Sequence, residues 1–99
     1  MMNRVGDVVT VMAANGAEYV GKLKSDESNK VVLEDPRFVT MSEQGMGFAN
    51  GIAATGVKDP KEVTLCNILF VTETNDEVAK AYRTSVSGIV MPTPGKLQL

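Results

Sequence analysis

Few side chains in this 99-residue chain could do catalytic chemistry. Cys66 is the single cysteine, and the chain has no histidine to activate a thiol or to help bind a metal. The glycine-rich segment 44–51 lacks the Gly-Lys-Ser/Thr ending of a phosphate-binding loop. Cys66 is expected to be a small buried hydrophobe in a strand. The sequence therefore predicts a protein that is not an enzyme, with no cofactor and no metal site.

Amide and lysine side chains offer binding chemistry instead. Asn29 and Asn67 can each present a hydrogen-bond donor and an acceptor to the edge of an unstacked base in a single strand. Lys30, with Lys22 and Lys24 on an outward strand face, could contact phosphate. Structural explanations stand beside these, because asparagine suits turns and exposed lysines are commonly only solvated. The formal net charge of −2 argues against binding of nucleic acid by bulk charge alone, so any such site would have to be local.

The composition is that of one ordinary globular domain over residues 1–99. Hydrophobic residues make up 43% of the chain and charged residues 22%, which excludes a disordered protein. No apolar run approaches the roughly 18 residues of a membrane span. The N-terminal residues 1–9 lack the apolar core of an export signal, and one cysteine fits a reducing compartment. We therefore expect a cytoplasmic protein with no membrane partner.

The elements that must position these side chains begin with a β-hairpin. Apolar residues alternate over 7–14, which predicts a two-sided strand. Asn-Gly at 15–16 is the strongest short-range signal for a two-residue hairpin turn, because both central residues need positive φ. The chain then returns as a second strand over 17–24.

Gly21 lies in the middle of this second strand, where glycine normally weakens a sheet. It shares the inward face with Tyr19 and Leu23, since alternate residues of a strand point to the same side. An inward glycine usually marks a sharp bend or a close approach by another backbone, and a tolerated glycine in a flat sheet is the plainer alternative. The first interpretation predicts a strand bent enough to serve both halves of a small barrel.

The first three strands are expected within 7–41. A polar turn is predicted at 25–29 and a third strand at 30–35. Pro36 would end that strand or push it to a sheet edge, and 37–41 could extend it beyond a kink.

Residues 42–60 are rich in glycine and small residues without a sustained period, and we expect a variable loop there. Asn50-Gly51 within it predicts another hairpin turn. Met41, Met46 and Phe48 could line a groove for a partner, and packing of the loop itself explains them equally well.

The segment 61–73 is too long and too continuously apolar for one half-exposed strand, so we expect two strands, at 62–66 and 68–73. A helix is predicted over 75–85, and a tail over 86–99. Ile89-Val90-Met91 in that tail could add an edge strand.

The predicted helix carries signals at its start and on one face. Thr74 and Glu77 have the spacing of a capping box. Val78, Ala81 and Tyr82 lie three and four residues apart and form the face expected to dock.

Residues 7–35 and 62–72 resemble the Sm-like (LSm) family. The first family signature is matched here by Val9, Val11, Asn15, Gly16, Glu18, Tyr19, Gly21, Leu23, Asp26, Asn29 and the acidic-ended run 31–35. The end of the second signature, an asparagine followed by an aliphatic-aromatic strand, is matched by 67–71.

The resemblance implies a mainly β fold, a small SH3-like barrel of five strongly bent antiparallel strands, here with one short C-terminal helix. In that family the fourth strand of one subunit pairs with the fifth of its neighbour, which closes a homo-oligomeric ring. The segment 61–73 would supply both strands, and its proline-free apolar edges would otherwise be exposed. Binding of single-stranded RNA or DNA is also implied, with Asp26, Asn29 and Lys30 in one loop and Asn67 in a second as the candidate residues.

The binding signature departs from the family pattern. Thr64-Leu65 stand where the second signature has Arg-Gly, and Ser28 stands where a large residue could stack on a base. Two functions follow from these observations. The chain is a noncatalytic ring protein that binds single-stranded nucleic acid in processing or chaperoning, or it is a structural assembly ring that has lost the nucleotide pocket. Asn29 favours the first, and the departures and acidic charge favour the second.

Overall fold

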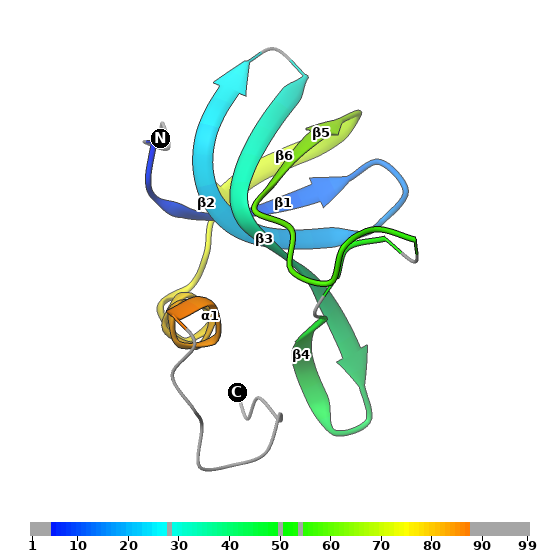
Figure 1. Ribbon diagram of the computed structural model, residues 1–99, viewed down its shortest axis with the longest axis vertical. Helices are drawn as coiled ribbons and strands as arrows, with labels where there is room; N and C mark the ends of the chain where they lie inside the picture. The colour runs from blue at the N-terminus through cyan, green and yellow to red at the C-terminus, as the bar shows by residue number, and fades with distance from the viewer. Residues whose placement is uncertain (1–4, 28, 50, 54, 88–99) are drawn as a thin grey trace.

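Six strands and one helix make up the part of the chain described by this computed structural model, residues 5–27, 29–49, 51–53 and 55–87. In chain order they are β1 (Val8–Ala13), β2 (Glu18–Glu27), β3 (Lys30–Ser42), β4 (Gly45–Ala49), β5 (Glu62–Cys66), β6 (Ile68–Glu73) and α1 (Asp76–Ser87) (Figure 1). All strand pairings are antiparallel. The mainly β fold with one C-terminal helix is confirmed, and β5 and β6 have the predicted bounds.

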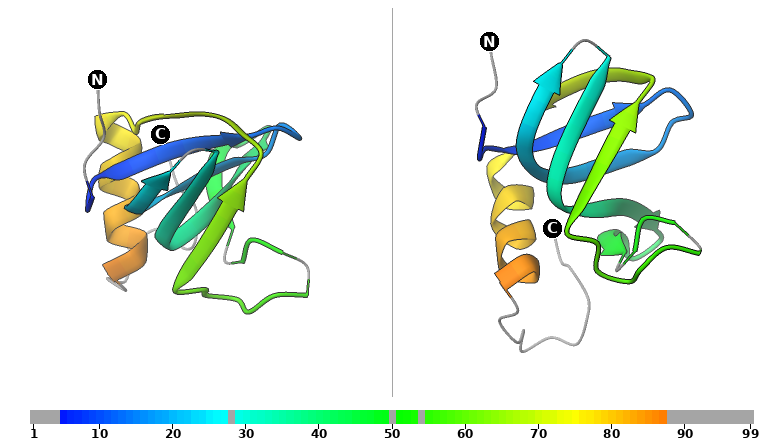
Figure 2. Two further views of the ribbon diagram at one scale, coloured as in Figure 1. Left: turned by 90° about the horizontal axis from the view of Figure 1, so that it is seen from above. Right: turned by 45° about the horizontal axis from the view of Figure 1, so that its top comes forward.

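The sheet curls and leaves the outer edges of β5 and β6 unpaired within the described residues. Its strands run in the order β4-β3-β2-β1-β6, while β5 pairs with β3. β3 changes partner along its length, because 30–34 pairs with β5 and 38–42 pairs with β4. Figure 2 shows the strong bend of β2 and β3 that produces this curl.

Gly21 is where β2 bends against β3. A Cβ atom on this glycine would lie 3.0 Å from Cβ of Leu33 and 3.2 Å from the carbonyl oxygen of Glu34. The register of β2 on β3 also shifts between Val20 and Lys22. The close backbone approach predicted for Gly21 is therefore confirmed, and a side chain there would push the two strands apart.

Gly21→Ala is expected to lower the free energy of unfolding by about 1–3 kcal/mol, the usual cost of overpacking a tight contact. Urea denaturation followed by circular dichroism measures this. Gly47→Ala is the matched control, since its Cβ would meet only the Thr40 hydroxyl at an ordinary 3.5 Å. Equal losses in both variants would contradict the assignment of Gly21 as the close-approach position.

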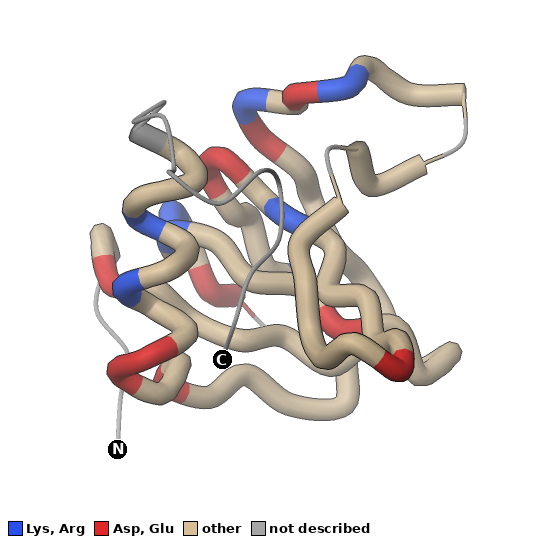
Figure 3. The backbone as a smooth tube through the Cα atoms, turned by 90° about the horizontal axis from the view of Figure 1, so that it is seen from below, with Lys and Arg blue, Asp and Glu red and all other residues tan. Residues whose placement is uncertain are grey.

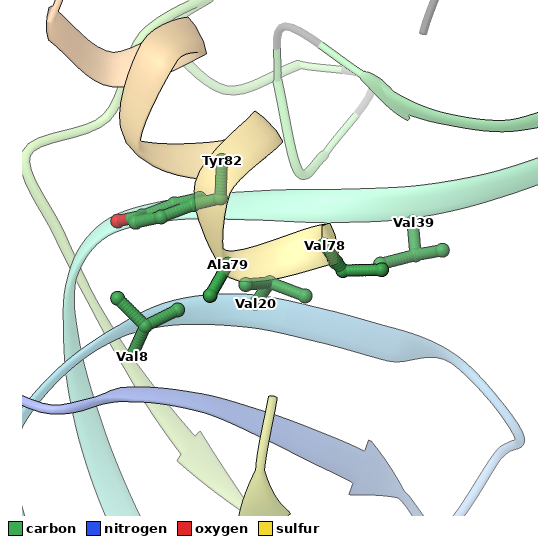
Figure 4. Close-up of a cluster of buried hydrophobic side chains, with 6 residues drawn as sticks. All are labelled: Val8, Val20, Val39, Val78, Ala79 and Tyr82. Atoms are coloured by element: carbon green, nitrogen blue, oxygen red, sulfur yellow. The ribbon is translucent and has the colours of Figure 1, made fainter. Parts of the chain in front are cut away.

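Two apolar clusters lie on opposite faces of the bent strands. The inner cluster fills the curl and contains Val9, Val11, Leu23, Val31 and Leu33. The outer cluster joins the sheet to α1 and contains Val8, Val20, Val39, Val78, Ala79 and Tyr82 (Figure 4). Val20, on the face expected to point outward, is thus covered by the helix.

The start and the docking face of α1 differ from expectation. The Asn75 Oδ1 accepts a hydrogen bond from the backbone N–H of Val78 at 2.9 Å, so Asn75 caps the helix. Thr74 is not the cap, since its hydroxyl bonds that of Thr10 at 2.9 Å. Val78 and Tyr82 dock as predicted, but Ala79 is buried with them while Ala81 is only half-buried.

Tyr82 anchors α1 to the bend in β3. Its hydroxyl donates to the carbonyl oxygens of Asp35 at 2.7 Å and Glu34 at 3.2 Å. Its ring lies edge-on to Phe48 of β4, with 6.2 Å between ring centroids. The ring is fully buried, and burial raises the pKa of the phenol well above its ordinary value.

The region around Pro36 and the segment after it also differ from expectation. β3 continues through a buried Pro36 to Ser42, so 37–41 does extend the strand, and Asp35 before it takes a left-handed φ of 48°. A sixth strand, β4, forms inside 42–60, with its hairpin turn at 43–44. Asn50 and the segment 89–91 lie outside the described residues.

Candidate nucleic-acid interface

Three turns meet at one end of the curled sheet. Lys30, the first residue of β3, is the Cα partner of Cys66, the last residue of β5. The backbone N–H of Ala14 donates to the carbonyl oxygen of Asn67 at 2.9 Å, which ties the β1–β2 turn to the β5–β6 junction. Asn29 directly precedes Lys30, and Asn67 directly follows Cys66, so the pairing of β3 with β5 brings both asparagines to this end.

Asn29 and Asn67 share an unusual backbone conformation and an exposed amide. Their φ angles are 59° and 54°, a left-handed geometry that asparagine tolerates better than most residues. The need for a left-handed backbone in these turns is therefore sufficient to explain asparagine at both positions. Within the described residues neither side chain makes a hydrogen bond or ion pair, so each amide is open to a ligand as well.

Asp26 and Lys30 lie on different faces of the β2–β3 hairpin. β2 extends through Glu27, which makes the turn predicted at 25–29 shorter than expected. Asp26 is opposite Val31 of the inner cluster, whereas Lys30 is opposite Glu27 and beside Cys66. Directly opposed residues share a face, so Asp26 lies at the inner rim and Lys30 on the outer side. The structure thus gathers Asn29, Lys30 and Asn67 and sets Asp26 apart.

Lys22 and Lys24 do not add to this end of the sheet. Lys22 Nζ lies 3.7 Å from an Asp35 carboxylate oxygen, and Lys24 Nζ lies 2.6 Å from Glu62 at the far end of β5. The hydrogen bond and charge of Glu62 raise the pKa of Lys24. Both lysines are thus engaged in ion pairs that link β2 to β3 and β5.

The second loop of the site carries no basic side chain. Leu65, at the position of the family arginine-glycine pair with Thr64, is half-buried against the inner cluster. Cys66 is exposed, which corrects the expectation of a buried thiol. Alternation explains this result, because Val63 and Leu65 occupy the inward positions of β5 and leave Cys66 outward.

A hollow beside Asn67 was not foreseen from the sequence. Its volume is about 300 Å³, and its walls are Ala13, Ala14, Asn15, Tyr19, Leu65, Cys66 and Asn67. The Tyr19 ring and the Asn67 amide give it the mixed aromatic and hydrogen-bonding character that suits a planar base. The Asn15 Oδ1 already accepts a hydrogen bond from the backbone N–H of Ala17 at 3.0 Å. The Asn15-Gly16 turn signal located one wall of this hollow, but only the fold brings β5 against it.

Arg37 is a buried charge that sequence reasoning also missed. Its guanidinium donates to the carbonyl oxygen of Pro36 at 2.9 Å and lies 3.1 Å from a carboxylate oxygen of Asp59. The pair fastens the segment before β5 onto β3. Because Asp59 occupies this guanidinium, Arg37 is a structural rather than a ligand-binding cation.

Charge at the turn end is mixed. Asp26 and Glu27 lie close to Lys30 in the hairpin register. Figure 3 shows the same interspersion of acidic and basic positions across the face it presents. No group of three or more His, Cys, Asp or Glu side chains among the described residues could hold a metal ion, and none of the described helices could cross a membrane. This end of the sheet therefore offers exposed amides rather than net positive charge.

No family model matches this chain, and no curated protein matches it. Among solved structures it is similar to a heptameric archaeal Sm protein, with 18% sequence identity and a TM-score of 0.49. The aligned region covers 72% of this chain and 90% of that protein. The heptameric state is a property of that archaeal protein.

Proposed function

We propose that this Sm-like chain forms homo-oligomeric rings that bind single-stranded RNA, or single-stranded DNA, without catalysis. The observation that carries the proposal is the meeting of Asn29 and Asn67 at one end of the sheet through the pairing of Lys30 with Cys66. Both amides are exposed and unengaged within the described residues. A role in nucleic-acid processing or chaperoning, in the cytoplasm where the lone Cys66 thiol would stay reduced, completes the proposal.

Amides suit this task because of what they offer to a base. Each asparagine has a carbonyl acceptor and an amino donor, which together match the hydrogen-bonding edge of an unstacked base. Lys30 provides one cation for phosphate, and two nearby carboxylates oppose it. With about one phosphate contact per subunit, affinity should fall only weakly with salt. The slope of log affinity against log salt concentration should be about −0.7 for each contact.

The ring supplies the affinity that one weak site lacks. The outer edges of β5 and β6 have no partner strand within the described residues, and β6 exposes Leu69 (64%) and Phe70 (49%). Natural monomers avoid open apolar edges of this kind. Pairing β5 of one copy with β6 of the next is a head-to-tail contact that can close into a ring. The end of the sheet where the three turns meet would then occur once per subunit around the ring, and this repetition would raise the overall affinity for a strand.

Removal of the Asn29 amide tests the proposed binding site. Asn29→Ala is expected to weaken binding of fluorescently labelled oligo-U about tenfold or more, the usual effect of losing a good base contact. Asn29→Gly separates this effect from backbone strain, because glycine tolerates the φ of 59°. Fluorescence polarisation measures affinity, and light scattering on the same samples verifies that the assembly is unchanged.

Gln44→Ala is the matched control, since it removes an exposed amide from the β3–β4 turn. That turn is not one of the three that meet at the candidate site. The rival function is a structural ring without a nucleotide pocket. The apolar Leu65 against the inner cluster favours it, because no guanidinium stands at that place. Asn29 variants that bind oligo-U as well as wild type would support the rival and contradict the binding proposal.

A further inference from the structure

The open outer edges of β5 and β6 carry residues in a complementary order. On β5, Val63 and Leu65 point toward the inner cluster. The β5 ladder extends one residue further back, because the backbone N–H of Asp35 donates to the carbonyl oxygen of Lys61 at 2.8 Å. Lys61 therefore lies on the same face as Val63, since alternate residues share a side.

On β6 the same face ends in a carboxylate. Val71 is the Cα partner of Val11, and Glu73 is the Cα partner of Val9, so both side chains lie on the side of the inner cluster. Leu69 lies at the irregularity where the β1–β6 register shifts, and it is 64% exposed. On this face the β6 edge presents Ile68, Val71 and Glu73, since Ile68 and Val71 pack against the inner cluster and Leu69 is the extra residue at the irregularity.

Lys61 and Glu73 have no ion-pair partner within the described residues. Both are exposed, and the ion pairs in this part of the chain are Lys22–Asp35, Lys24–Glu62 and Arg37–Asp59. The neighbouring Glu62 is already neutralised by Lys24. The charges left over at the β5 and β6 edges are therefore the cation of Lys61, directly before β5, and the anion of Glu73 at the end of β6.

One antiparallel register satisfies all of these residues together. Every strand pair in the sheet is antiparallel, and the same sense between copies continues it. With Val63 opposite Val71, Lys61 lies opposite Glu73, and Leu65 lies near the irregular start of β6, where Ile68 occupies the inner face. A shift of β6 by two residues along β5 would place Glu73 opposite Val63, or Lys61 opposite Val71. A shift that sets Glu62 opposite Glu73 joins two carboxylates, which is destabilising.

We infer that copies of this chain join in that register, with Lys61 of each copy ion-paired to Glu73 of the next. The inference rests on the proposed ring and adds what fixes its register. The apolar part of the seam is formed by Val63, Leu65, Ile68 and Val71, and the Lys61–Glu73 pair closes its outer end. Because a strand shifted by one residue presents its other face, the charge pair selects against slipped assemblies.

Charge reversal tests the inference. Lys61→Glu places two carboxylates in every seam, and Glu73→Lys places two ammonium groups there. Each single variant is expected to dissociate at about tenfold higher protein concentration than wild type at low salt, since repeated like-charge contacts act at every seam. The double variant K61E/E73K restores opposite charges at every seam and is expected to assemble as wild type does. An equimolar mixture of the two single variants restores them at each seam where the variants alternate, and is expected to assemble better than either variant alone.

Light scattering over a dilution series provides the readout, and circular dichroism verifies folding. Lys80→Glu on α1 and Glu43→Lys in the β3–β4 turn are matched controls, because they change the same charges at exposed positions away from both edges. Single variants that assemble like wild type, while wild type is multimeric, would overturn the register and leave the ring standing. Single variants that associate more strongly would show that these charges oppose pairing of the two edges, and this result would also overturn the proposed register. A monomeric wild type would overturn ring and register together.

Discussion

Tyr82→Ala is expected to lower the free energy of unfolding by about 3–5 kcal/mol, the range for removing a fully buried aromatic side chain. Tyr82 is 0% exposed and joins α1 to β3 through its two hydroxyl hydrogen bonds and to β4 through Phe48. Loss of the ring leaves a cavity in the outer cluster and unpairs two carbonyl oxygens near the bend. Urea denaturation monitored by circular dichroism measures the change.

Tyr82→Phe separates the hydroxyl from the ring and is expected to cost about 1–3 kcal/mol. It also has a pH signature. Burial raises the pKa of Tyr82 in the folded state above its ordinary value of 10.0, so wild type keeps this stabilisation below pH 10 and loses it as pH rises further. The stability difference between wild type and Tyr82→Phe should therefore shrink above pH 10. A difference that is constant with pH, or a Tyr82→Ala loss below about 1 kcal/mol, would contradict this role of Tyr82.

Leu69→Glu is expected to convert the proposed multimer to a monomer while leaving the subunit folded. Leu69 is 64% exposed in the subunit, so a carboxylate there costs little in the isolated chain. In the proposed seam the same carboxylate would lie on the β6 edge where β5 of the next copy packs. Such a change costs about 2–4 kcal/mol at each contact, as at interface hot spots.

Size-exclusion chromatography with light scattering measures the mass of the Leu69→Glu variant. Met41→Glu is the control, because Met41 is 75% exposed on the β3–β4 hairpin and lies outside the seam. It should keep the wild-type mass. A Leu69→Glu protein that remains multimeric would show that β6 is not the assembly edge.

Local patterns predicted the parts of the fold that depend on local chemistry. The Asn15-Gly16 turn, the inward Gly21 and the break between β5 and β6 near Asn67 follow from turn propensity and alternation. The predictions were wrong where contacts between elements far apart in the sequence determine the structure. Val20 is buried only because α1 returns over the sheet, and Asn75 replaces Thr74 as the helix cap because Thr74 bonds Thr10.

The candidate site shows the same division. Asn29 and Asn67 were proposed from residue type and family resemblance, and the pairing of β3 with β5 brings them together. Sequence alone could not show that Asp26 lies on the inner face, since that follows from its register with Val31. Nor could it show that Lys22 and Lys24 are engaged by Asp35 and Glu62, because these ion pairs depend on the curl of the sheet.

The most direct test of the central claim is the mass of the wild-type chain with labelled oligo-U, measured by light scattering during size-exclusion chromatography. A ring that binds single strands should elute as a multiple of the 10.6 kDa subunit, with the oligonucleotide in the same peak. Moderate salt should leave that peak largely intact, because amides rather than many phosphate contacts hold the strand. A 10.6 kDa monomer with free oligo-U, at low salt and high protein concentration, would contradict both assembly and binding.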